Sequence, residues 1–133
     1  MTGEQLGISG FKALKADHDE IERGFRALLD FEQAHPDLFH YSSTRYYTRD
    51  VPESSDEEYW MFIDRFQDFE DYKTSLIAAA QREEVKQLFL PAISHARGFL
   101  TGAADPTTGL PNLMQLVQHW TEVPSLRVDD QGH

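Results

Sequence analysis

The sequence predicts an α+β fold in which strands and helices follow one another as β-α-β-β-α-β. Residues 59–66 are dense in aromatic and large apolar side chains, which is typical of a well-buried strand. Immediately afterwards the apolar spacing becomes helical, with Phe69, Tyr72 and Leu76 on one face and Asp68 as a suitable N-cap. A similar succession of an apolar strand and an amphipathic helix opens the chain.

The first strand is predicted over residues 8–14. Asp17 and Glu20 have the spacing of a capping box, with Asp in the place of Ser or Thr. The helix that follows is expected to run to about His35, because Pro36 cannot continue it.

The middle of the chain predicts a β-hairpin. Residues 38–49 are rich in Tyr and Thr, residues 52–56 form a turn, and residues 59–66 return as the next strand. The acidic run 53–58 is expected to be a solvated hairpin loop. Since the strand 59–66 is apolar on both faces, we expect helices on one face and a second copy of the sheet on the other.

The second half supplies another helix and a closing strand. The helix is predicted over residues 68–90, with a break near Gln81, and residues 97–111 are expected to be a loop insertion. Residues 113–123 fit either a helix face or a strand; we favour the strand because the pattern otherwise lacks its last member. The tail 129–133 is expected to be loose. This order is the ferredoxin-like arrangement, with helices on one face of an antiparallel sheet.

Length and composition predict a single domain over residues 1–133, with its core at about 8–123. The net charge is −11, the reverse of the basic surface that nucleic acids and anionic membranes require. No apolar run is long enough to span a bilayer, and no basic, apolar leader precedes the first strand, so we expect a cytoplasmic protein. The absence of cysteine excludes disulfides and thiolate zinc sites.

Two segments resemble the antibiotic biosynthesis monooxygenase-like proteins. Residues 11–17 leading into 20–29 are similar to the first strand and helix of that family, and residues 59–76 are similar to its third strand and second helix. The resemblance covers roughly residues 8–92. It implies a dimeric α/β barrel: a homodimer whose two four-stranded sheets face each other, each subunit holding a pocket between its own sheet and helices.

The superfamily includes cofactor-free oxygenases of polyketide anthrones, polyketide cyclases, muconolactone isomerases and haem-degrading enzymes. The haem-degrading members carry a Trp and a His on the second helix, and this chain has neither between Gln67 and Leu90. Fold alone does not choose among the remaining activities.

The start of the first helix is also similar to haemerythrin-like proteins, because His18 and Glu22 lie one turn apart. A di-iron bundle needs further inward-facing His and carboxylate pairs, and no later His-x-x-x-His or His-x-x-x-Glu occurs in the chain. We therefore predict no metal site, and we expect His18 to be an exposed residue of the first helical turn.

His119 and Trp120 are the first candidate site residues. On a strand they point to opposite faces, so one of them is expected to face a pocket beneath the helices. A neutral His119 there could accept a proton from a phenolic or enolisable substrate. The alternative is a hydrogen-bonded histidine with a structural role.

Aromatic residues on the two middle strands form a second group of candidates. They fit either a core and dimer interface or a flat cavity for a phenolic ligand. Tyr46 and Tyr59 are candidate catalytic residues together with His119, while Trp60, Trp120 and Arg45 are candidates for binding the substrate.

Two charged residues interrupt the apolar strand 59–66. Asp64 and Arg65 must face opposite ways, so we expect one of them to reach the pocket or a partner subunit.

The function predicted from these observations is that of a small monooxygenase without a cofactor, acting as a homodimer on an aromatic or polyketide-like molecule. The alternatives are a non-catalytic ligand-binding protein, or a polyketide cyclase or isomerase, of the same fold.

Overall fold

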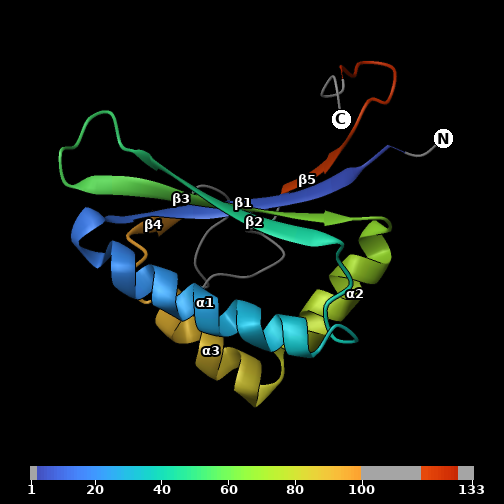
Figure 1. Ribbon diagram of the computed structural model, residues 1–133, viewed down its shortest axis with the longest axis horizontal. Helices are drawn as coiled ribbons and strands as arrows, with labels where there is room; N and C mark the ends of the chain where they lie inside the picture. The colour runs from blue at the N-terminus through green and yellow to red at the C-terminus, as the bar shows by residue number, and fades with distance from the viewer. Residues whose placement is uncertain (1–2, 100–117, 129–133) are drawn as a thin grey trace.

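The computed structural model of the protein describes residues 3–99 and 118–128. An antiparallel sheet carries helices on one of its faces (Figure 1). The elements in chain order are β1 (Gln5–Leu14), a 3-10 turn (Lys15–Asp17), α1 (His18–Ala34), β2 (Ser43–Asp50), β3 (Glu57–Phe66), α2 (Phe69–Ala80), α3 (Glu83–Ile93), β4 (Gly98–Phe99) and β5 (Gln118–Thr121).

The three long strands form the body of the sheet in the order β2-β3-β1, with every pair antiparallel. Tyr46 lies opposite Phe62, and Trp60 lies opposite both Phe11 and Thr48. Because side chains alternate along a strand, these five residues share the face that the helices cover.

The place of the last strand is shared by two short strands. β4 pairs with the C-terminal half of β1, and β5 pairs with its N-terminal half. The strand prediction for 113–123 is thus correct for residues 118–121, while 98–99, expected in a loop, form part of the sheet. The predicted loop 100–111, residues 112–117 and the tail 129–133 lie outside the described residues.

The ferredoxin-like prediction is confirmed by this topology, with differences at the element ends. The first strand begins three residues earlier than predicted, and residues 38–42 precede β2 rather than forming part of it. The expected break near Gln81 separates α2 from α3. Pro91 lies inside α3, since the helix continues to Ile93.

The two predicted N-caps have different outcomes. The Asp68 side chain accepts a hydrogen bond from the Asp71 amide, so this cap is confirmed. Asp17 occupies the N-cap position of α1 but makes no capping hydrogen bond, so the capping box is wrong. Its carboxylate lies 3.4 Å from His95 Nδ1 instead.

The core lies between the sheet and the α1–α3 layer. Phe11, Phe25 and Trp60 are at most 4 % exposed, and their rings lie 6.1–6.3 Å apart. Gly24 of α1 faces Ala92 of α3 so closely that an added Cβ would lie 2.9 Å from the Ala92 Cα. The small residues therefore set the spacing of these two helices.

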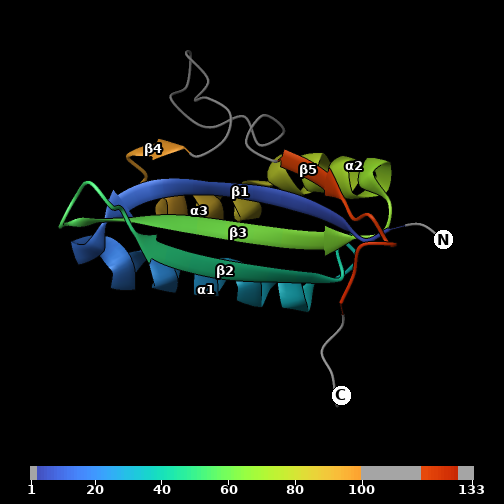
Figure 2. The same cartoon turned by 90° about the horizontal axis from the view of Figure 1, so that it is seen from above.

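The opposite face of the sheet carries no helix among the described elements (Figures 1 and 2). Alternation places Leu6, Ile8, Met61 and Ile63 on this face, and Tyr47 lies there at 45 % exposure. No helix in the described part of the chain is long and apolar enough to cross a membrane.

Candidate functional site

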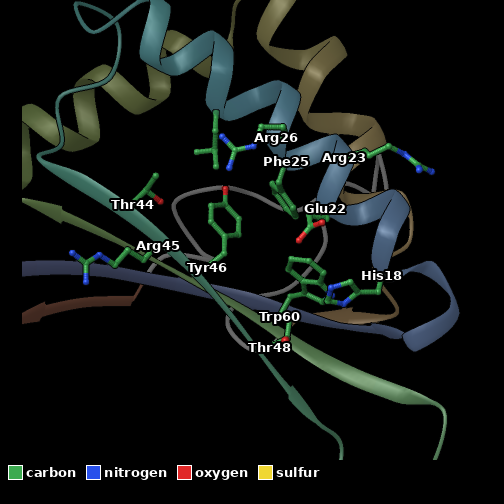
Figure 3. Close-up of a pocket in the computed structure, with 11 residues that line it drawn as sticks. His18, Glu22, Arg23, Phe25, Arg26, Thr44, Arg45, Tyr46, Thr48 and Trp60 are labelled. Atoms are coloured by element: carbon green, nitrogen blue, oxygen red, sulfur yellow. The ribbon is translucent and has the colours of Figure 1, made fainter.

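A cavity of about 710 Å³ opens between α1 and strands β2 and β3 (Figure 3). One wall comes from successive turns of α1, and the other from the helix-facing side of the sheet near its β2 edge. The lining residues are His18, Glu22, Arg23, Phe25, Arg26, Leu29, Thr44, Arg45, Tyr46, Thr48 and Trp60.

One end of the cavity is formed by a histidine held by a buried carboxylate. His18 Nδ1 lies 2.6 Å from Glu58 Oε1, and the same oxygen accepts a 3.0 Å hydrogen bond from the Trp60 indole. The Glu58 side chain is 9 % exposed and that of His18 is 37 % exposed. Since Glu58 accepts both bonds, Nδ1 is the protonated nitrogen of neutral His18. Its Nε2 makes no hydrogen bond within residues 3–99 and 118–128, and its lone pair is free to accept a proton.

The hydrogen bond to Glu58 raises the pKa of His18 above its ordinary value, while burial opposes the change. The imidazole therefore binds a proton more strongly than a free histidine does. A His–carboxylate pair of this kind orients the ring and stabilises the imidazolium that forms when a proton is taken up.

Aromatic rings line the interior of the cavity. Tyr46 lies 4.8 Å from Phe25 and 5.2 Å from Phe62, ring centre to ring centre, and the His18 ring lies 5.0 Å from that of Trp60. Such a surface suits a planar apolar molecule, which would stack on the rings and displace water.

The Tyr46 hydroxyl makes no hydrogen bond to any residue of the described part. No fully buried side-chain oxygen or nitrogen there lacks a partner, so this hydroxyl opens to the cavity. Burial raises the pKa of Tyr46 well above its ordinary value, so Tyr46 remains a neutral donor at physiological pH.

Two carboxyl groups lie near Tyr46, and each accepts a hydrogen bond from another tyrosine. Tyr41 donates to Glu32 at 2.5 Å, and Tyr72 donates to Asp64 at 2.6 Å. Burial raises the pKa of Glu32 to about 7 and also raises that of Asp64. Both charges also act on Tyr46 and disfavour its ionisation.

The cavity brings together some of the predicted site residues. Tyr46 and Trp60 line it from the helix-facing side of the sheet. Arg45 is also among the lining residues, but it lies opposite Ile63 and so projects toward the helix-free face. Tyr59 lies on the opposite face of the sheet, because it alternates with Trp60 along β3. Asp64 faces the helices, where it meets Tyr72, and is thus the member of its pair directed toward the interior.

His119 and Trp120 lie away from the cavity, on β5. They pair with Gly7 and Leu6 of β1 and so point to opposite faces, as predicted. His119 is exposed, stacks on Phe69 of α2 at 4.0 Å and meets the Gln5 side chain at 2.8 Å through Nε2. Trp120 is 55 % exposed on the helix-free face.

Sequence reasoning missed the His18–Glu58 pair. The prediction that Glu58 lies in a solvated loop is wrong, because the β1–β3 pairing brings the end of the hairpin beneath the start of α1 and buries this residue. His18 lies in the first turn of α1, as predicted, but its side chain is only 37 % exposed because it lies against Glu58. The available signal was the alternation in β3, which puts Glu58 on the same face as Trp60. Arg65, on the other face, pairs with Glu4 at 3.1 Å.

No group of three or more His, Cys, Asp or Glu side chains in residues 3–99 and 118–128 is arranged to hold a metal ion. His95 contacts Asp17 and, at 2.9 Å, Glu20.

Comparison with known proteins agrees with the topology. A dimeric ferredoxin-like protein of unknown function from Jannaschia sp. CCS1 is 21 % identical; the match covers 72 % of this chain and 93 % of that one, with a TM-score of 0.50. A proposed antibiotic biosynthesis monooxygenase from Caulobacter crescentus CB15 is 10 % identical over 92 % of both chains, with a TM-score of 0.49. SnoaB, a cofactor-independent oxygenase from Streptomyces nogalater, is 10 % identical over 78 % of this chain and 97 % of its own, with a TM-score of 0.44.

The protein is therefore an α+β protein of the ferredoxin-like class, and the resemblance predicted from the sequence is confirmed at the level of the fold. No family model matches the chain, and no curated protein matches its sequence.

Proposed function

We propose that the protein is a cofactor-independent monooxygenase that acts on a phenolic or polyketide-like aromatic molecule, with His18 as the proton acceptor. One observation carries the proposal: an imidazole fixed by a buried carboxylate through one nitrogen lines an aromatic cavity of about 710 Å³. The SnoaB oxygenase and the protein from Caulobacter crescentus have described activities of the same kind, but the proposal does not rest on them.

In the proposed reaction, His18 Nε2 takes a proton from an activated C–H or O–H of the substrate. The resulting anion is electron-rich and transfers an electron to O₂; the two radicals then combine to a peroxide anion, which takes the proton back from His18. Loss of water from this peroxide converts a CH₂ group of the substrate to C=O, so one oxygen atom enters the product and the other leaves as water. The residues of the chain supply the base, its orientation by Glu58 and an aromatic surface that holds the ring.

Oxygen uptake with 1,8-dihydroxyanthrone as the substrate tests the assignment. The wild-type protein is expected to accelerate uptake, and His18→Ala is expected to lose about 10²–10⁴-fold of the acceleration, which is the usual contribution of a general base. His40→Ala is the matched control, because His40 bonds to Asp71 on the surface and does not line the cavity.

The outcome for His119→Ala decides between two bases. Loss of activity in His119→Ala but not in His18→Ala would overturn the assignment and return the role to His119. Substrate turnover without oxygen uptake would instead identify a cyclase or isomerase, which needs the same base. Ligand binding without turnover would identify a non-catalytic binding protein.

We further propose that the protein is a homodimer joined through the helix-free face of the sheet. Leu6, Ile8, Met61 and Ile63 form an apolar band there, and Trp120 extends it at 55 % exposure. An uncovered apolar sheet face of this kind usually marks an interface. The Jannaschia protein with the same fold is described as dimeric.

Sedimentation of the wild-type chain is expected to give twice the mass of one chain. Ile63→Glu is expected to give single chains, because the partner's apolar face cannot accept an unpaired carboxylate without a large desolvation cost. A monomeric wild-type protein would contradict the proposal.

A further inference from the structure

We propose that Arg26 and Tyr46 form a subsite for a carboxylate, so that the ligand of the cavity is an aromatic acid. The inference deepens the proposed function, from which it takes the aromatic cavity, and adds a second point of attachment away from His18. The two residues come from different elements, Arg26 from α1 and Tyr46 from β2.

Positive charge is unevenly placed along the lining of the cavity. The chain as a whole has a net charge of −11, and the acidic Glu22 of the cavity lining is accompanied by three arginines, of which only Arg26 is directed toward Tyr46. A field set by the whole protein would repel anions, so attraction of an anion here requires local cations.

The three arginines of the lining point in different directions. Figure 3 shows Arg26 reaching from α1 toward the hydroxyl end of the Tyr46 ring, whereas Arg23 and Arg45 point away from that part of the cavity. The only ion pair of Arg26 in the described part of the chain is with Asp30, at 3.6 Å, and both side chains are more than 60 % exposed. Exposed pairs one helical turn apart contribute little to stability, so Asp30 does not hold the guanidinium firmly.

The Tyr46 hydroxyl supplies the second donor of the subsite. Its ring is fixed between Phe25 and Phe62, and the hydroxyl opens to the cavity without a hydrogen-bond partner in the described part of the protein. A carboxylate has two oxygens that accept hydrogen bonds. The neutral hydroxyl would donate a directional hydrogen bond to one oxygen, and the guanidinium would donate a charged hydrogen bond to the other. This combination suits a carboxylate better than a neutral carbonyl.

Binding of two matched probes tests the subsite. We would titrate the protein with 1-hydroxy-2-naphthoate and with 1-naphthol, which differ only in the carboxylate, and measure both affinities by calorimetry. The wild-type protein is expected to bind the acid about tenfold more tightly than 1-naphthol. This is the gain in affinity expected from one charged hydrogen bond. Arg26→Gln is expected to remove most of this preference, and Tyr46→Phe is expected to reduce it about threefold.

Arg23→Gln is the matched control, because it makes the same change of charge one turn away on α1. It is expected to keep the preference. Equal affinity of the two probes in the wild-type protein, binding of neither probe, or an unchanged preference in Arg26→Gln would overturn the inference. An equal loss in Arg23→Gln and Arg26→Gln would also overturn it, because the preference would then come from general electrostatics.

The result is separable from the proposed function. Equal binding of both probes, together with His18-dependent oxygen uptake, would remove the subsite and leave the oxygenase. A carboxylate preference that depends on Arg26, without oxygen uptake, would leave a binding protein for aromatic acids.

Discussion

The stability of the protein should depend on the protonation of Glu32. This carboxyl group lies behind the cavity wall, bonded to Tyr41, and burial raises its pKa from 4.5 to about 7. The charge of Asp64 disfavours the ionisation of Glu32 further. The folded state therefore binds a proton more strongly than the unfolded chain does.

The sign and size of the effect follow from linkage. Glu32 contributes its full stability below the unfolded pKa of about 4.5, and this contribution is lost as pH rises toward the folded pKa of about 7. A shift of this size corresponds to about 3 kcal/mol, at about 1.4 kcal/mol for each pKa unit. The loss should be complete at about pH 8.

Urea unfolding of wild type and Glu32→Gln between pH 5 and pH 8 measures the effect. Glutamine keeps an acceptor for Tyr41 but does not titrate, so the variant should lose about 2–3 kcal/mol less than the wild type over this range. Because both proteins contain His18 and His40, the contribution of these titrations to the pH dependence cancels in the difference between wild type and variant. A pH dependence that is the same in both proteins would refute the reasoning, and so would a wild type that gains stability relative to the variant as pH rises.

Two further predictions concern the helix contact and the base. Gly24→Ala should destabilise the protein by about 1–3 kcal/mol in urea unfolding, despite the better helix propensity of alanine, because the new Cβ would meet the Ala92 Cα at 2.9 Å; a stabilised variant would show that the two helices separate easily. Glu58→Gln should move the acidic limb of the pH–activity profile to lower pH, since the hydrogen bond to Glu58 is the main cause that raises the pKa of His18; an unmoved limb would show that another group titrates.

The order of strands and helices could be predicted because it depends on local patterns. The alternation and aromatic density of β3, the helical spacing after Asp68 and the turn at residues 52–56 all lie within short segments. The predicted element ends were less accurate. Residues 38–42 have the composition of a strand, but they lie outside the sheet, which the chain enters only at the start of β2.

The site depended on contacts that no short segment reveals. His18 and Glu58 are forty positions apart, and only the register of β1 with β3 brings them together. Tyr46, Trp60 and Arg45 were found because aromatic and cationic residues on middle strands are reasonable pocket residues in this fold. His119 was selected for its expected strand, but that strand pairs at the edge near α2, away from the cavity.

The most direct test of the account is proton removal by His18 in the absence of oxygen. Under anaerobic conditions in D₂O, the protein is expected to accelerate deuterium incorporation at the acidic CH₂ of 1,8-dihydroxyanthrone, followed by NMR, and His18→Ala is expected to abolish the acceleration. Exchange at the uncatalysed rate with the wild-type protein, or undiminished exchange with His18→Ala, would contradict it.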